Sequence, residues 1–182
     1  MKRASTLFLI LLTVVLALAS CRTATPVEEK KPQVVYEAVF VNDAQVASFF
    51  REVRGEAPYP NEKTEFHVTT AFMPEQDARD LYGSEITVLI TGYIDGEATM
   101  DDGRTTRNEG FKVELLSADP DMTVYLEESP ILFHITGSYK DAAKYTGQLD
   151  FSAAQPVSFV TTGFFGAYLT DSTVTFSPST LR

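Results

Sequence analysis

The chain has 182 residues, 44% of them hydrophobic and 22% charged, which suits one folded domain and excludes disordered and collagen-like chains. The formal net charge is −10, so the surface repels long nucleic acids, whereas a small anion in a local pocket is compatible with it. A single cysteine excludes a disulfide framework and a cysteine-based zinc site. Any histidine chemistry must use His67 and His134, because the chain has no other histidine.

The first 20 residues have the pattern of a secretory signal peptide. Two basic residues precede a run at 7–18 that is apolar except for one threonine and is too short to cross a bilayer. Small residues directly before Cys21 predict a bacterial lipoprotein signal, in which this cysteine carries the lipid and anchors the protein in the cell envelope, outside the cytoplasm. The alternative is an ordinary signal peptide with the cysteine merely nearby. We expect a signal peptide at 1–20, the lipidated cysteine and a flexible tether at 21–33, and one domain at 34–182.

The domain is predicted to be rich in strands, with one clear helix. Asn42 and Asp43 are residues preferred at helix N-caps, and the apolar spacing that follows predicts a helix ending at Gly55. Because strands and helices do not alternate regularly, the pattern favours an α+β fold over a doubly wound parallel sheet. Strands are expected at 34–41, 66–72, 86–94, 111–116, 131–139, 157–162 and 168–176, short helices at 75–82 and 141–145, loops at 57–63 and 119–129, a turn at 101–103 and a tight bend at 163–166.

Both histidines occur in the same four-residue sequence motif, called the H-x-T word below, on two different predicted strands. Side chains at positions i and i+2 of a strand share a face, so each histidine is expected beside its threonine, with the apolar residues on the opposite face. A lone histidine on a strand is most often a satisfied core residue, but repetition of the whole word favours a functional pair. The two words are Phe66-His67-Val68-Thr69 and Phe133-His134-Ile135-Thr136.

Two histidine–threonine pairs supply the groups needed to open a phosphodiester without a metal. A neutral imidazole can take a proton from water, and a protonated imidazole can give one to the leaving oxygen. Threonine hydroxyls can donate hydrogen bonds to the phosphate oxygens as charge develops on them. A separate protein nucleophile is not required.

This paired H-x-T pattern resembles that of the 2H phosphoesterases. The chain is similar to one branch in particular, the 2',3'-cyclic-nucleotide 3'-phosphodiesterases, which are related to the phosphodiesterase domains of tRNA ligases. The resemblance covers about residues 34–176. It includes Tyr36 as an aromatic residue on the first strand and the segments HVTTAF (67–72), GFKVEL (110–115), TGQLD (146–150) and TGFFG (162–166).

The resemblance implies an α+β fold of two lobes, with antiparallel sheets facing a central cleft and one H-x-T word per lobe. It implies hydrolysis of a 2',3'-cyclic phosphate to a 2'-phosphate with no cofactor or metal. In that chemistry His67 would protonate the leaving 3'-oxygen and His134 would activate water. The residues that would hold the phosphate are Thr69 and Thr136, and those that would contact the rest of the substrate are Phe72, Tyr36 and Gly147.

Two features depart from the family pattern. Gly137, directly after the second word, is smaller than the residue usual there, and an envelope location separates this domain from tRNA repair. We therefore expect the substrate to be a small cyclic phosphate, a nucleotide or a short RNA end. The alternative is a non-catalytic envelope lipoprotein that uses the same fold to bind a nucleotide or a protein.

Three other kinds of site lack support in the sequence. The two histidines do not have the spacing of zinc ligands. The acidic and glycine-rich stretch at 95–103 lacks the spacing of a calcium loop, so a hairpin turn explains it better. The G-x-S-x-G motif of serine hydrolases is absent from the sequence.

Overall fold

The computed structural model describes residues 31–177 and 179. The predicted signal peptide at 1–20, the predicted lipidation site Cys21 and the tether up to residue 30 lie outside this described part of the chain. Among residues 31–177 and 179, no helix is long and apolar enough to cross a membrane.

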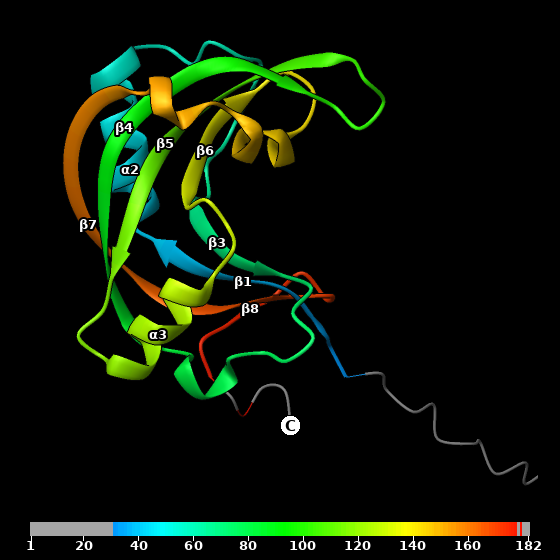
Figure 1. Ribbon diagram of the computed structural model, residues 1–182, viewed down its shortest axis with the longest axis vertical. Coiled ribbons are helices and arrows are strands. Elements are labelled where there is room, and N and C mark those ends of the chain that lie inside the picture. The colour runs from blue at the N-terminus through cyan, green and yellow to red at the C-terminus, as the bar shows by residue number, and fades with distance from the viewer. Residues whose placement is uncertain (1–30, 178, 180–182) are drawn as a thin grey trace, which may run out of the picture. The chain divides into compact units, whose positions relative to one another are not determined.

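The strands form one mostly antiparallel, open sheet with few helices, so the predicted α+β class is confirmed (Figure 1). The order in the sheet is β2-β6-β5-β4-β7-β1-β3, and β8 pairs with β7. One continuous sheet takes the place of two separate ones, because β7 pairs with β4 along its first part and with β1 along its second. The strands are β1 (Val34–Val41), β2 (Asn61–Glu62), β3 (His67–Phe72), β4 (Glu85–Thr99), β5 (Thr105–Leu116), β6 (His134–Tyr139), β7 (Gln155–Leu169) and β8 (Val174–Thr175).

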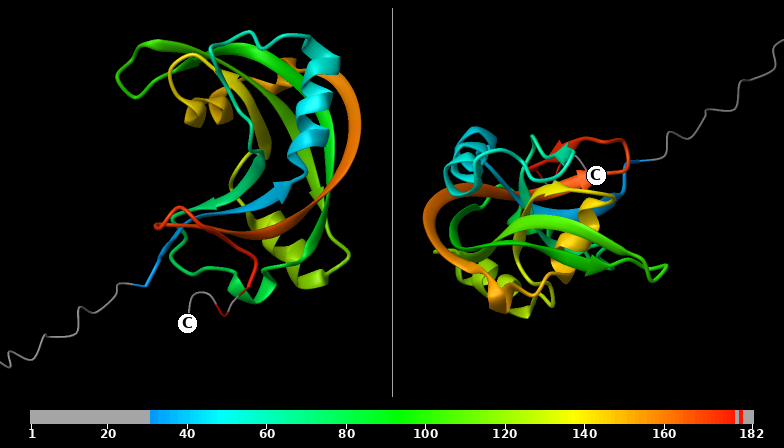
Figure 2. Two further views of the ribbon diagram at one scale, coloured as in Figure 1. Left: turned by 180° about the vertical axis from the view of Figure 1, so that it is seen from behind. Right: turned by 90° about the horizontal axis from the view of Figure 1, so that it is seen from above.

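The sheet curves so strongly that β3 and β6 lie side by side, although four strands separate them in the sheet order (Figures 1 and 2). Irregular pairing accompanies this curvature: the register shifts between Ile90 and Gly92 of β4, and again between Glu37 and Ala38 of β1. Such bulges bend a strand and increase its twist. The curvature therefore brings the two H-x-T words together from strands that are far apart in the sheet order.

The predicted helix after the first strand is confirmed as α2 (Asp43–Arg54). The Asn42 side chain accepts a hydrogen bond from the backbone N–H of Gln45, and Gly55 ends the helix with a φ of 76°. Val46, Phe49 and Phe50 are buried against the sheet.

The loop predicted at 119–129 is wrong, because this segment forms α3 (Pro120–Glu128). Asp119 caps the helix by accepting hydrogen bonds from the backbone N–H groups of Asp121 and Met122, and proline is favourable at the first helical position. The same aspartate–proline pair is common in turns, which explains the error. The other helical segments are short 3₁₀ turns: η1 (Arg79–Leu81), η2 (Ala143–Gln148) and η3 (Phe151–Ala153). Of the helix expected at 75–82, only η1 forms.

The bend predicted at 163–166 is also wrong, because β7 runs through it without interruption. Gly163 pairs with Val41 and Gly166 with Ala38, so the two glycines lie in a regular ladder with β1. The strands expected at 86–94 and 111–116 likewise extend into the long hairpin of β4 and β5, which turns at 101–103.

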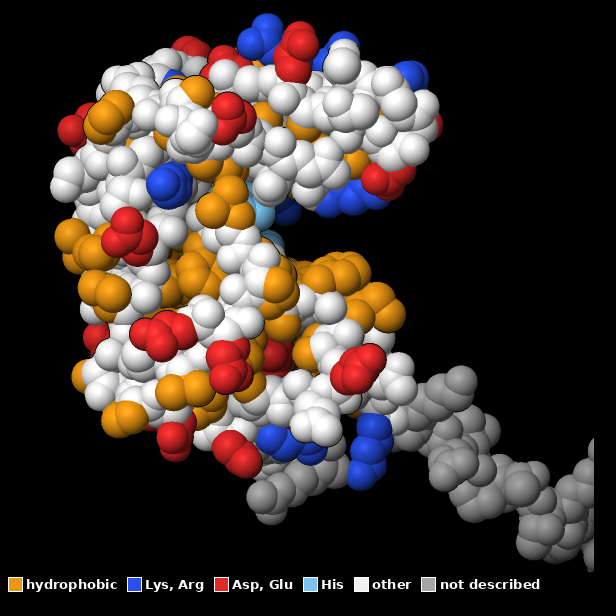
Figure 3. Space-filling model, viewed as in Figure 1, with side chains coloured by type: hydrophobic (Ala, Val, Ile, Leu, Met, Phe, Trp, Pro, Cys, Tyr) orange, Lys and Arg blue, Asp and Glu red, His pale blue; other side chains and the backbone are white. Residues whose placement is uncertain are grey.

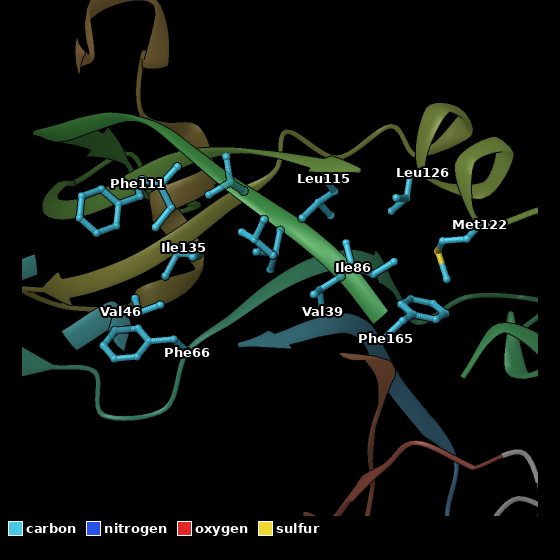
Figure 4. Packing of buried hydrophobic residues seen from close by; sticks show 14 of the residues in the cluster. Val39, Val46, Phe66, Ile86, Phe111, Leu115, Met122, Leu126, Ile135 and Phe165 are labelled. Carbon is cyan, nitrogen blue, oxygen red and sulfur yellow. The ribbon is translucent and has the colours of Figure 1, made fainter. Parts of the chain in front are cut away.

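One large hydrophobic cluster fills the space between the sheet and its helices (Figure 4). Its centre includes Phe50 and Phe111, whose stacked rings have centroids 3.9 Å apart. A second, smaller cluster packs η2 and η3 against the tip of the β4–β5 hairpin, and consists of Ala98, Met100, Tyr145, Leu149 and Phe151. This second cluster fixes the segment beside the second H-x-T word.

The packing of Gly137 generates a stability prediction. A Cβ atom at this position would lie 2.5 Å from Phe50 Cε1 and 2.8 Å from Glu109 Oε1, and both of these side chains are buried. Gly137→Ala should therefore lower the free energy of unfolding by about 1–3 kcal/mol through overpacking. Gly96→Ala is the matched control, because its nearest neighbour would be Leu149 Cδ2 at an ordinary 3.5 Å. Chemical denaturation of both variants checks this; equal stabilities would contradict the assigned packing.

Candidate active site

The two H-x-T words present their side chains in the same alternating way on β3 and β6. Val68 and Ile135 are fully buried. The histidine and threonine on either side of each are only partly buried, as expected for residues that share the other face.

His67, Thr69, His134 and Thr136 all line one cavity of about 450 Å³. Figure 3 shows histidine side chains at the inner end of a hollow in the surface, with hydrophobic side chains along its lower edge. The remaining lining residues include two of the three predicted substrate contacts. They are Tyr36, Lys63, Glu65, Phe72, Ile131, Ala143 and Lys144.

Tyr36 packs against the ring of His67, and neither face of the Tyr36 ring is free. Its ring stacks on His67 with centroids 5.0 Å apart and on Tyr168 at the same distance. Because β1 lies between β7 and β3, the two partners approach Tyr36 from opposite sides. Tyr36 therefore supports His67 within the wall of the cavity, and the substrate contact expected for it stays a prediction.

The pKa of His67 is lowered to about 4. The main cause is that its ring is withdrawn from water, and positive charges on Lys63 and His134 lower the pKa further. The two histidines are thus electrostatically coupled, so their titrations belong to the pair. In the free protein at neutral pH, His67 is uncharged.

His134 is held in one orientation by its backbone and by close packing. Its Nδ1 donates a hydrogen bond to the carbonyl oxygen of Leu132 at 2.8 Å, which leaves Nε2 of the neutral ring with the free electron pair. Burial lowers the pKa of His134, and the hydrogen bond to Leu132 offsets part of that effect. Nε2 is therefore the atom that can accept a proton.

Gly147, predicted to contact substrate, lies against His134 and is not among the residues lining the cavity. A Cβ atom there would be only 3.0 Å from Cε1 of the imidazole. Asn108 holds this segment in position, since its buried side chain donates to the carbonyl of Ala142 and to the hydroxyl of Thr146. Glycine thus permits close packing of the η2 segment on the histidine.

A buried carboxyl group supports β3 from behind. Glu37 is fully buried and accepts hydrogen bonds from the hydroxyls of Tyr82 and Tyr125, each at 2.9 Å, and from the N–H of Ala78 at 2.6 Å. The Tyr125 hydroxyl also bonds to that of Thr70, the neighbour of Thr69 on the opposite face of the strand. α3 and η1 are thereby connected to the strand that carries the first H-x-T word.

The charged residues of the cavity, Lys63, Glu65 and Lys144, were not identified from the sequence. Lys63 lies at the end of the loop predicted at 57–63, and Lys144 lies in the short helix predicted at 141–145, which forms part of η2. Neither lysine belongs to a sequence motif. Lys144 is engaged with Asp101, whose carboxylate lies 2.5 Å away, whereas Lys63 acts electrostatically on His67. Only the fold places these two cations beside the histidines.

Within the described part of the chain, no three histidine, cysteine or acidic side chains are grouped so that they could hold a metal ion. Comparison with protein families, with curated proteins and with solved structures finds no match to this chain. The interpretation of the site therefore depends on its geometry and on the sequence words.

The environment of His67 generates a prediction about its titration. Removing the positive charge of Lys63 by Lys63→Met should raise the pKa of His67 from about 4 toward the ordinary value, because a like charge disfavours the imidazolium. Lys144→Met is the matched control, since this lysine lines the same cavity but is paired with Asp101. NMR titration resolves the two histidines of the chain directly. An unchanged His67 titration in Lys63→Met would contradict the assigned coupling.

Proposed function

We propose that this protein hydrolyses a 2',3'-cyclic phosphate to a 2'-phosphate without a metal ion, as a 2H phosphoesterase does. The main support is that two histidine–threonine pairs, from strands separated by four others in the sheet order, line one cavity. Its volume of about 450 Å³ is suitable for a nucleotide. In this proposal the two ends of the curved sheet act as the two lobes of the family.

His134 is the proposed general base. Its Nε2 takes a proton from a water molecule as the water oxygen attacks phosphorus, and the Leu132 carbonyl stabilises the imidazolium through Nδ1–H. The orientation that this bond imposes reduces the freedom lost when the transition state forms.

His67 is the proposed general acid. As the bond from phosphorus to the 3'-oxygen breaks, the imidazolium gives its proton to that oxygen, and the products are a 3'-hydroxyl and a 2'-phosphate. The lowered pKa of His67 means that the free protein at neutral pH does not hold this proton. An anionic phosphate bound between the histidines favours the imidazolium, so binding of the substrate prepares the acid.

Thr69 and Thr136 are proposed to donate hydrogen bonds to the phosphate oxygens. Phe72 is the proposed contact for the base or ribose. It is 66% exposed at the edge of the cavity, so its ring is available for stacking, unlike that of Tyr36. We also propose that the lipid on Cys21 anchors the domain to a membrane of the bacterial cell envelope, facing outside the cytoplasm.

The principal test is hydrolysis of 2',3'-cyclic AMP by the purified protein in the presence of EDTA. We expect 2'-AMP as the product and no loss of rate with the chelator. His67→Ala and His134→Ala should each lower kcat by roughly 10²- to 10⁴-fold, and the double variant should be little worse, because the pair acts as a unit.

A matched pair of threonine variants provides the control for this test. Thr69→Val should lower kcat by roughly 10²- to 10³-fold, because it removes a donor at the phosphate. Thr99→Val makes the same substitution at an exposed position of the β4–β5 hairpin, outside the cavity, and should leave kcat unchanged. A protein that binds 2',3'-cyclic AMP without hydrolysing it would favour the non-catalytic alternative, and a rate restored by zinc would overturn the metal-free mechanism.

The pH dependence follows from the sign of the two pKa shifts. The base works only above its pKa and the acid only below its own, so kcat/KM should be bell-shaped. Both histidines have lowered pKa values, that of His67 about 4, so the maximum of kcat/KM should lie below the ordinary histidine pKa of about 6.5. The profile of kcat should be displaced to higher pH, because bound phosphate raises both values. A maximum of kcat/KM above pH 7 would contradict this electrostatic description.

A further inference from the structure

A second cavity, of about 490 Å³, adjoins the first. The two cavities share Tyr36, Lys63, Glu65 and His67 in their linings, so the stacked Tyr36–His67 pair forms the partition between them. The other lining residues take no part in the proposed mechanism. Asp43 and Phe66 lie beside the shared residues, and the rest lie at the ends of β1 and β7 and around β8: Phe40, Val41, Tyr168, Ser172, Val174 and Phe176.

Aromatic side chains dominate the wall of this second cavity. Phe176 is 43% exposed, and its ring meets that of Phe40 edge-on with centroids 5.5 Å apart. Tyr168, on the other side, is one end of the stack that continues through Tyr36 to His67. A planar aromatic group is the ligand that such walls accommodate best, because base–aromatic stacking does not depend on a particular hydrogen-bond pattern.

The charges around the cavity indicate how that group is joined to the rest of the ligand. Lys63 and Glu65 belong to both linings, so a cation and a carboxylate lie where a linker would pass from one cavity to the other. Lys63 is half-buried there, whereas Glu65 is exposed, so the charge of Glu65 is more strongly screened by water and salt. Asp43 is held against the backbone before β3, since its Oδ1 accepts a hydrogen bond from the N–H of Phe66 at 2.7 Å. A phosphodiester linker would be attracted by Lys63 at this junction.

We infer that the second cavity is a subsite for the nucleoside on the 5' side of the cyclic-phosphate nucleotide. The preferred substrate is then an RNA end of at least two nucleotides, with the cyclic phosphate between the histidines and the preceding base among Phe40, Tyr168 and Phe176. The inference rests on the proposed function. The net charge of −10 disfavours a longer polyanion and so restricts recognition to the end of the strand.

The experiment compares 2',3'-cyclic AMP with adenylyl-adenosine ending in a 2',3'-cyclic phosphate. We expect kcat/KM for the dinucleotide to exceed that for the mononucleotide by about tenfold, through stacking of one additional base. Phe176→Ala should abolish this advantage while leaving kcat/KM for the mononucleotide unchanged. Phe164→Ala is the matched control, because Phe164 is also half-exposed and contacts Phe176, but lines neither cavity.

Val174→Glu is a second variant that keeps the test decisive if Phe176→Ala does not fold. Val174 is 42% exposed in the lining of the second cavity, and a longer, negatively charged side chain there should oppose entry of the anionic dinucleotide and remove the same tenfold advantage. Equal kcat/KM values for the two compounds in the unmodified protein would overturn the subsite and leave the proposed function standing. If neither compound is hydrolysed, the proposed function fails. Equilibrium binding of the same two compounds then tests whether the subsite exists. Tenfold tighter binding of the dinucleotide would support the subsite, and equal affinity would overturn it.

Discussion

β7 changes partner along its length, pairing first with β4 and then with β1, and this exchange holds the curved sheet together. Without a strand of this length, the segments carrying the two H-x-T words would belong to separate sheets. Since the exchange is made of backbone hydrogen bonds, it constrains the relative position of β3 and β6 more firmly than loop contacts would. The coupling between His67 and His134, the shared cavity and the partition of the two cavities all depend on that position.

Local patterns predicted the elements whose signals agree with one another. The helix after Asn42 has a cap, an apolar stripe and a terminal glycine, and all three were in the sequence. The alternation around His67 and His134 was similarly sufficient to predict which side chains share a face. Other features depend on partners distant in the chain: the TGFFG segment looked like a bend because its pairing with β1 could not be seen locally. Lys63 was not predicted as a site residue for the same reason, since only the folded chain brings it close to the histidines.

The comparison of Tyr36 with Phe72 shows how neighbouring strands decide the use of an aromatic residue. Both were expected to contact substrate, and both line the cavity. Tyr36 is on a strand with neighbours on each side, so its two faces are covered by Tyr168 and His67. Phe72 is at the end of the outermost strand on that side and remains mostly exposed. An aromatic ring on an edge strand can thus remain available to a ligand, whereas a ring on an inner strand is covered by its neighbours and supports their side chains.

The buried Glu37 carboxyl group has a consequence for the motions of the domain. Its three donors come from two segments: Ala78 and Tyr82, on either side of η1, donate to Oε1, and Tyr125 of α3 donates to Oε2 and also holds Thr70 of β3. Releasing either segment would leave one buried carboxyl oxygen without a partner, a state that costs about 1–3 kcal/mol. The segments are therefore expected to open together or not at all, as one cooperative unit of local unfolding. Fluctuations that would displace Thr69 from the cavity are then as rare as the opening of that whole unit.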